Sequence, residues 1–389
     1  MDAVGIETKV AEGTGATPQR ALAIDRKHRR RGFLPEQDPL TAFPPDSEFA
    51  VLDTIGHDLP SLLHDRGFRD YARSFVIPLW PVNRAGDGDL PQLRLYYLRT
   101  GFLASAYINQ VGAEPANVLP ANLARPLVRV CKLLKRPPIL SYDGYALYNW
   151  KRFRRDGPIA LGNIDTIQNF VQLYDEHWFI LVHVAIEAIA ARILDAVDLV
   201  ARALATGQPA AIDPALDQIA EALREQIRVL RQIPEKMDPA LYYRTFRPYI
   251  RFFEKVAYED TDSAVPLRFN FRGETGAQSS IMPLLVAFMK VPHRPSMLTD
   301  HLADMRNYMP LEHRELLEAV AAMPSIRTLS SKPSYNAILE AMAEFRAVHY
   351  GWADEYINQR TDDPRGTGGT PFMRWLKQLI DETIAFKID

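Results

Sequence analysis

The chain has 389 residues, of which 47% are hydrophobic and 24% are charged, and its formal net charge is -2. This composition is typical of a globular protein, and the length predicts two or three domains. A net charge so close to zero argues against a partner that is recognised mainly through its phosphate groups, so we expect no nucleic-acid partner.

The N-terminal residues 1–30 are rich in Gly, Thr, Ala and charge, which predicts a disordered tail. We interpret the basic run RKHRRR near its end as a solvated charge cluster. Over 31–158, proline-rich turns such as LPEQDPLTAFPP separate short helical patterns. These patterns predict a small, mainly helical N-terminal domain that ends in an aromatic-rich crossover.

Longer helical patterns fill residues 159–389. The segment 173–205 is apolar nearly all round in its first half, which is typical of a helix buried in a bundle. Further periodic patterns predict helices over 214–233, 239–256, 281–290, 296–307, 311–323, 335–358 and 371–386. No alternating pattern with hairpin turns indicates strands. We therefore predict an all-α fold in which the large helical domain carries the chemistry and the N-terminal domain covers it.

A single cysteine, Cys131, excludes an intrachain disulfide and a multi-cysteine zinc site. The N-terminus has no apolar segment of the signal-peptide kind, and the chain has no uncharged apolar window of about 20 residues. We therefore expect a soluble protein of the reducing cytoplasm that does not bind membranes.

One histidine falls on the apolar face of the predicted helix 335–358. Positions 338, 342, 345, 349, 352 and 356 trace that face, so His349 points into the core. A buried imidazole is either a hydrogen-bonded core residue or a ligand. The zinc motifs HxxxH, HExxH and CxxC are absent from the sequence. Haem needs only one protein ligand, because its macrocycle supplies four others.

A second histidine, His183, interrupts the apolar run WFILVHVAIEAIAA. Phe179 lies four residues before it on the same helix face, and Glu187 four residues after it. His183 is either a core residue bonded to a backbone carbonyl or the polar group of an aromatic pocket on the far side of a haem held by His349.

Two glycine-containing loops and one arginine have two interpretations each. In RGTGGTPFM, Thr370 and Pro371 suit the start of the last helix, whereas Thr367 is free to hold a charged group close to the backbone. In RGETGAQSS, a turn of small residues offers a surface for a flat ligand: Thr275, Gly276 and Ala277. Arg247, within LYYRTFRPYIRFFEK, is either a surface arginine or one that binds a carboxylate through two parallel hydrogen bonds.

Together these segments resemble the indoleamine 2,3-dioxygenase family of haem proteins. The matching segments occur in order through GFLPEQDPL, VLPANLARP, RPPILSYDGYALYNW, FRPYIRFF, GETGAQSS, LADMRNYMPLEHRELL, FRAVHYGWADEYI and RGTGGTPFM. The resemblance implies a small domain over a large all-helical haem domain.

The resemblance also implies roles for single residues. It makes His349 the proximal ligand of haem b, whose iron is ferrous in the active state, and Arg346 a partner of a haem propionate or of its salt-bridge network. It implies that Arg247 binds the substrate carboxylate and that Thr367 lies near the amino-acid head group. The remaining implied positions line the indole pocket or lie beside haem and substrate: Tyr142, Tyr145, Ala146, Phe179, Thr275 and Gly276.

Two positions differ from the better-known animal members of the family. His183 stands where those enzymes carry serine, and it is similar to the distal histidine of the related tryptophan 2,3-dioxygenases, which bonds the indole N–H. Tyr145 replaces a smaller residue, so we expect a narrower pocket.

The implied function is a cytoplasmic oxidoreductase of tryptophan catabolism, in the kynurenine pathway. It would add both atoms of O2 across the indole C2–C3 bond of L-tryptophan or a related indoleamine and give an N-formylkynurenine-type product. Its partners would be the indole, O2 and a reductant, and the oligomeric state stays open. The alternatives are a haem mono-oxygenase or rearrangement enzyme acting on a substituted indole, a non-enzymatic haem or gas-binding protein, and a helical scaffold without a cofactor.

Overall fold

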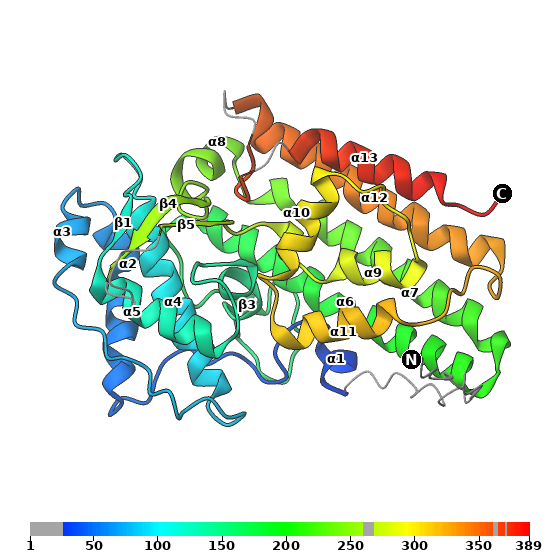
Figure 1. Ribbon diagram of the computed structural model, residues 1–389, viewed down its shortest axis with the longest axis horizontal. Coiled ribbons are helices and arrows are strands. Elements are labelled where there is room, and N and C mark those ends of the chain that lie inside the picture. The colour runs from blue at the N-terminus through cyan, green and yellow to red at the C-terminus, as the bar shows by residue number, and fades with distance from the viewer. Residues whose placement is uncertain (1–25, 260–267, 361–364, 370–371) are drawn as a thin grey trace, which may run out of the picture.

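Helices dominate the fold, as the sequence predicts (Figure 1). The computed structural model describes residues 26–259, 268–360, 365–369 and 372–389. The helices of the first half are α1 (Arg26–Arg31), α2 (Val51–Leu62), α3 (Phe68–Ala72), α4 (Leu90–Ile108) and α5 (Ala121–Leu133). The later helices are α6 (Tyr174–Thr206), α7 (Ile212–Leu230), α8 (Pro239–Leu241), α9 (Ile281–Met289), α10 (Met297–Arg306), α11 (Leu311–Ala321), α12 (Lys332–Tyr356) and α13 (Phe372–Ala385).

Short turns and strands complete the described fold. Two π-helical turns are η2 (Asp143–Leu147) and η5 (Tyr242–Phe246). The 3-10 turns are η1 (Glu48–Ala50), η3 (Pro209–Ala211), η4 (Ile233–Glu235), η6 (Gly276–Gln278) and η7 (Asn358–Arg360). The strands are β1 (Val118–Leu119), β2 (Lys151–Arg152), β3 (Ile164–Asp165), β4 (Phe253–Tyr258) and β5 (Arg268–Phe271).

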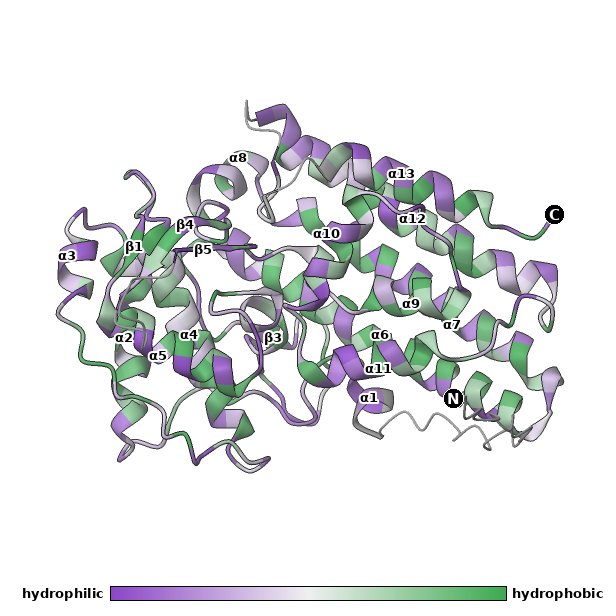
Figure 2. Ribbon diagram, in the orientation of Figure 1, coloured by the Kyte–Doolittle hydropathy of each residue, from purple (hydrophilic) through white to green (hydrophobic). Residues whose placement is uncertain are grey.

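A helical bundle forms the larger part of the molecule. The 33-residue helix α6 packs against α7, α7 packs against α12, and α12 packs against α13. The helices α6 and α9, inside the bundle, carry mainly hydrophobic residues (Figure 2). Gly207, in the left-handed conformation with φ 64°, ends α6 as a glycine C-cap. None of the described helices is long and apolar enough to cross a membrane.

A separate buried core, the first core along the chain, lies around α2, α4 and α5, on the left of Figure 1. A three-stranded sheet belongs to this part, with β1 parallel to β4 and β4 antiparallel to β5. Its pairing joins Val118 to Ala257, so residues from the second half of the chain complete the first core. The smaller unit is therefore not confined to residues 31–158.

The predicted helix over 239–256 is wrong. Only the short α8 and the π-helical turn η5 form there, and the chain then enters β4. Pro248 has no N–H to donate within a helix, and the segment after it pairs with strands from two distant parts of the chain. The tertiary pairing of β4 with β1 and β5 therefore overrides the helical periodicity of this segment.

The predicted tail also ends earlier than we expected. Residues 1–25 lie outside the described part of the chain, but α1 is helical and packs on α6. His28 is 6% exposed, and its Nδ1 lies 3.2 Å from Gly32 O, while Arg31 pairs with Asp38 at 2.8 Å. For His28 and Arg31, the interpretation of the basic run as solvated charge is therefore wrong.

Gly32 provides a test of this docking. Its φ is 64°, and a Cβ there would overlap Glu187 O and lie 2.9 Å from Ala191 N, both on α6. Gly112 has φ 82° but no atom within 4 Å of such a Cβ. We predict that Gly112→Ala costs about 1 kcal/mol of stability through backbone strain alone, whereas Gly32→Ala costs about 1–3 kcal/mol more through overpacking. Chemical denaturation of the two variants measures the difference, and equal losses would contradict the close packing of α1 on α6.

Candidate active site

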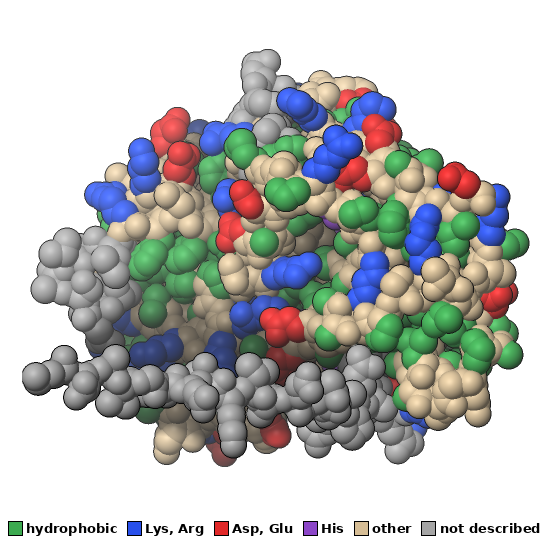
Figure 3. All heavy atoms as spheres, turned by 45° about the vertical axis from the view of Figure 1, so that its right-hand side comes forward, with side chains coloured by type: hydrophobic (Ala, Val, Ile, Leu, Met, Phe, Trp, Pro, Cys, Tyr) green, Lys and Arg blue, Asp and Glu red, His purple; other side chains and the backbone are tan. Residues whose placement is uncertain are grey.

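His349, on α12, faces His183, on α6. Desolvation lowers the pKa of His349 to about 4, with His183 adding to the effect, so the two rings lie near each other deep in the protein. His349 nevertheless has the accessible surface of an exposed residue. Both facts hold because the residue borders a hollow within the protein. The surface in Figure 3 is hollowed near the middle, where part of a histidine side chain is visible. His349 is a neutral imidazole without a hydrogen-bond partner among the described residues, as a metal ligand requires.

His183 is half-buried and has one nitrogen engaged. Its Nδ1 lies 2.7 Å from Phe179 O, and a carbonyl can only accept, so Nδ1 carries the proton and Nε2 is left as an acceptor. Desolvation lowers the pKa of His183, which keeps the ring neutral, although the bond to Phe179 opposes this shift. The rings of Phe179 and Tyr142 lie 4.6 and 5.8 Å from its own. The expectation of an aromatic environment for His183 is therefore met.

Both π-helical turns supply aromatic side chains near His183. The Phe179 ring lies 6.3 Å from that of Tyr145, in η2, and 5.5 and 6.0 Å from those of Tyr242 and Phe246, in η5. Tyr145 donates to Glu176 Oε1 at 3.1 Å, which fixes its ring. Such π-helical segments are frequent at functional sites. Neither Tyr242 nor Phe246 was predicted to line the site, because the periodicity of their segment indicates an ordinary helix.

Three other residues were predicted to line the pocket or to lie beside haem and substrate: Tyr142, Ala146 and Gly276. Tyr142 is 2% exposed and donates to Glu187 Oε1 at 2.8 Å. Ala146 is 1% exposed and lies in the same π-helical turn as Tyr145, packed in the first core. Gly276 faces open space, with no atom within 4 Å of an added Cβ.

Arg247 directly follows η5 and is buried, with 5% of its surface exposed. The surface interpretation of this residue is therefore wrong. Its Nη2 donates to Arg365 O at 3.2 Å, while its Nε is buried without a hydrogen-bond partner among the described residues. A buried guanidinium with an unused N–H is suited to bind an anion.

The loop that holds Thr367 lies next to Arg247 and to the turn of Thr275. Thr367 is 9% exposed, and the loop closes through a bond of 2.9 Å from Gly369 N to Gly366 O. A Cβ at Gly368 would lie 3.6 Å from Thr275 Cγ2. The predicted capping pair at 370–371 lies outside the described residues.

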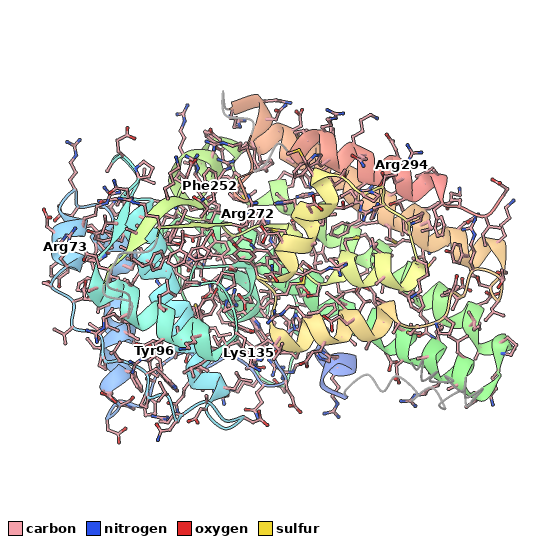
Figure 4. All side chains as sticks on the ribbon, viewed as in Figure 1. Arg73, Tyr96, Lys135, Phe252, Arg272 and Arg294 are labelled. Atoms are coloured by element: carbon pink, nitrogen blue, oxygen red, sulfur yellow. The ribbon has the colours of Figure 1, made fainter. Side chains whose placement is uncertain are left out.

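Two side chains from other elements support the loop. Figure 4 shows Phe252 and Arg272 near the middle of the molecule, and a Cβ at Gly369 would lie 3.3 and 3.7 Å from them. Arg272 Nη1 also donates to Gly368 O at 3.3 Å, and its Nε donates to Asp304 at 2.9 Å. The loop of Thr367 therefore lies beside both Arg247 and the turn of Thr275.

Arg346 has other partners than the propionate that we expected. It is 6% exposed, and its Nη1 donates to Leu379 O at 2.9 Å and to the Thr383 hydroxyl, both on α13. Burial lowers its pKa to about 10, and Glu382 acts in the opposite direction. Arg346 therefore ties the helix of His349 to α13.

The residues around His349 fit haem. Among the described residues, no group of three or more His, Cys, Asp or Glu side chains could hold a metal ion, so a metal at His349 needs further ligands from a cofactor. Haem supplies them and needs one neutral, accessible imidazole. Open space beside Gly276 leaves room for a flat ring next to Thr275.

A sequence model of the family described as indoleamine 2,3-dioxygenase matches residues 26–364, and the chain belongs to this family of haem-dependent oxidoreductases. It is 31% identical to the human indoleamine 2,3-dioxygenase 2 over 323 residues, which are 75% of this chain and 78% of the relative. It is 28% identical to the indoleamine 2,3-dioxygenase of Saccharomyces cerevisiae, with 95% of each chain covered. A 6-hydroxytryptophan 2,3-dioxygenase of Fusarium equiseti is 25% identical, with 91% of this chain and 94% of the relative covered.

We predict that His349→Ala lowers the haem content of the purified protein by more than about tenfold, because the variant would lack the imidazole that we expect to hold the iron. The Soret absorbance per protein measures this content, and added imidazole should restore part of it. His57→Ala, at an exposed position of α2, is the control and should keep its haem. A haem-replete His349→Ala protein would contradict the assignment.

Proposed function

We propose that this enzyme adds both atoms of O2 across the indole C2–C3 bond of L-tryptophan or a related indoleamine and releases an N-formylkynurenine-type product. The observation that carries the proposal is the position of His349, a neutral imidazole with no hydrogen-bond partner among the described residues. It lies opposite His183, Phe179 and the two π-helical turns, one of which leads into the buried Arg247.

His349 would hold haem b, which in its ferrous form would supply the chemistry with O2. The protein must then hold the indole in one orientation and keep water away from it. Thr275 and Gly276 would lie beside the cofactor, since their turn is small and open. Arg346 would keep His349 in place through its bonds to α13.

Arg247 would bind the substrate carboxylate. Its Nε has no partner among the described residues, and the planar guanidinium can present a second N–H alongside it, which gives a bidentate bond. Thr367, in the loop whose neighbour Arg365 accepts from Arg247, would orient the same head group. Such charge-assisted bonds contribute about 1.5–3 kcal/mol each.

The aromatic side chains would enclose the indole ring. Phe179 would pack on its face, and Tyr142 and Tyr145 would border it, each held by a bond to a buried carboxylate. Because Tyr145 is fixed to Glu176, it cannot easily turn aside for a larger ring. The small side chain of Ala146 would leave space for the indole ring next to Tyr145.

His183 would steer the indole N–H. Its Nδ1 is committed to Phe179 O, so Nε2 is the acceptor that remains. A neutral imidazole in this position accepts one hydrogen bond and thereby selects one orientation of the ring.

We infer a reducing compartment such as the cytoplasm, where a cellular reductant keeps the iron ferrous. The protein's own thiol, that of Cys131, does not act as this reductant, because it is buried and burial raises its pKa to about 12.

A substituted indole is the second candidate for the substrate. The relative from Fusarium equiseti is named for 6-hydroxytryptophan, and the fixed Tyr145 would limit which ring position could carry the substituent. A mono-oxygenase or rearrangement reaction on such an indole is the corresponding alternative activity.

Turnover under labelled O2 tests the proposal. The haem-loaded, reduced enzyme should consume tryptophan and incorporate both labelled oxygen atoms into a product with the absorbance of a formylkynurenine. One labelled atom would favour the mono-oxygenase, and a stable oxygen complex without consumption of any indole would favour a gas-binding protein.

The role of His183 is tested with 1-methyltryptophan, which has no indole N–H. We expect His183→Ala to lower kcat/KM for tryptophan about three- to tenfold, the effect of one neutral hydrogen bond, and to leave kcat/KM for 1-methyltryptophan nearly unchanged. Equal losses with both substrates would show that His183 acts only through packing.

A further inference from the structure

The loop of Thr367, residues 365–369, depends on other elements for its position. It contains three glycines, and Gly369 has φ 82°. The described hydrogen bond within it joins Gly369 N to Gly366 O at 2.9 Å. Glycine loses more conformational freedom on ordering than any other residue, so one bond of this kind is too weak to fix the loop. Contacts from outside the loop must therefore set the position of Thr367.

Two arginines hold the loop by its backbone, one on each side of Thr367. Arg247 Nη2 donates to Arg365 O at 3.2 Å, and Arg272 Nη1 donates to Gly368 O at 3.3 Å. Arg365 lies two residues before Thr367, and Gly368 directly follows it. Both bonds come from charged donors, which hold an acceptor more strongly than neutral donors do. Thr367 is therefore fixed between two points.

Arg272 is itself held at its backbone and at its side chain. It directly follows β5, and its backbone N–H donates to the Tyr308 hydroxyl at 2.9 Å. Its Nε donates to Asp304 Oδ2 at 2.9 Å. A guanidinium is planar and presents its N–H groups in a fixed arrangement, so the bond to Asp304 also fixes the direction of Nη1.

The helix α10 contributes a second contact from the same face. His301 lies three residues before Asp304, and residues at this spacing are neighbours on a helix surface. A Cβ at Gly368 would lie 3.6 Å from His301 Cε1 and 3.6 Å from Thr275 Cγ2. This face of α10 therefore contacts the loop directly through His301 and indirectly through Arg272.

The pair of Arg272 and Asp304 adds little to the stability of the fold. Their side chains are 36% and 38% exposed, and ion pairs at such positions contribute little, because water screens the charges and both side chains lose rotamer freedom. What the pair does set is the direction of the guanidinium. A change at Arg272 should therefore leave the protein folded and alter the loop.

We propose that Arg272 is a positioning residue, which holds Thr367 in place for the amino-acid head group of the substrate. Asp304 orients its guanidinium, and His301 supports the same loop. This assignment rests on the proposed function, because it takes Thr367 to orient the head group.

Direct binding of the substrate carboxylate is the competing role for Arg272. Two of its nitrogens are already engaged, Nε by Asp304 and Nη1 by Gly368 O. Arg247 is 5% exposed and has a buried Nε without a partner among the described residues, which suits a carboxylate better. The partly exposed position of Arg272 also weakens a charged bond there, because the effective dielectric constant is higher near water. The positioning role is therefore favoured.

The test compares L-tryptophan with 3-methylindole, which has the ring but no amino-acid head group. Dissociation constants are measured without O2, from the change in the absorption spectrum of the haem-loaded protein. We expect Arg272→Met to weaken tryptophan binding about three- to tenfold and to change 3-methylindole binding less than about twofold. Arg272→Lys should lose less, because an ammonium group can keep one of the two bonds.

A double-mutant cycle separates positioning from direct contact. Thr367→Val removes the hydroxyl and keeps the shape of the side chain, and it should also weaken tryptophan binding. If Arg272 acts through Thr367, adding Arg272→Met to Thr367→Val should weaken binding by less than about a further twofold. Independent effects of the two changes would show that Arg272 acts on the substrate by itself, and this result overturns the proposal.

Arg268→Met is the matched control. Arg268, in β5, is exposed and donates to Lys255 O at 3.1 Å rather than to the loop, so its loss should change neither constant. Equal weakening of both ligands by Arg272→Met, unchanged tryptophan binding, or loss of haem overturns the proposal. So does a wild-type protein that binds tryptophan no more tightly than 3-methylindole. Product formation by the wild-type enzyme is followed separately, so tryptophan that binds without being converted would count against the proposed function and not against this assignment.

Discussion

The site depends on one face of α6, which carries polar groups through an apolar core. Glu176, Phe179, His183 and Glu187 succeed one another at helical spacing on this face. Burial raises the pKa of Glu176 and of Glu187 to about 7, and hydrogen bonds to each carboxylate oppose the shift. Tyr145 bonds to the first carboxylate, and Tyr142 to the second. These two bonds fix η2 against α6 at points on either side of Phe179 and His183, so the aromatic wall and the histidine share one rigid frame.

The second side of the pocket depends on how the chain leaves η5. Pro248 comes directly after Arg247 and cannot donate a hydrogen bond to an extended helix, so the chain bends and enters β4. Arg247 thus stands at the end of a π-helical turn, next to the loop of Thr367. The same β4 pairs with β1 of the smaller core. The sheet that joins the two parts of the molecule therefore also positions the arginine.

Local periodicity and family motifs made part of this structure predictable from the sequence. The bundle helices carry clear amphipathic patterns, and His349, His183 and Arg247 were found from helix faces and motifs. The strand β1 has only two residues, and its partner lies far along the chain, so no local pattern reveals it. The partners of Arg346 lie on α13, which no pattern within α12 indicates.

The pocket groups without protein partners differ from Arg99, in the first core, whose guanidinium has carboxylate and amide partners within the protein. The imidazole of His349 and the Nε of Arg247 have no hydrogen-bond partner among the described residues. Each such group lowers stability until a partner completes it. A metal on the imidazole and an anion on the guanidinium would complete both groups, so the stability lost at these two groups would be recovered as affinity for the ligands of the pocket.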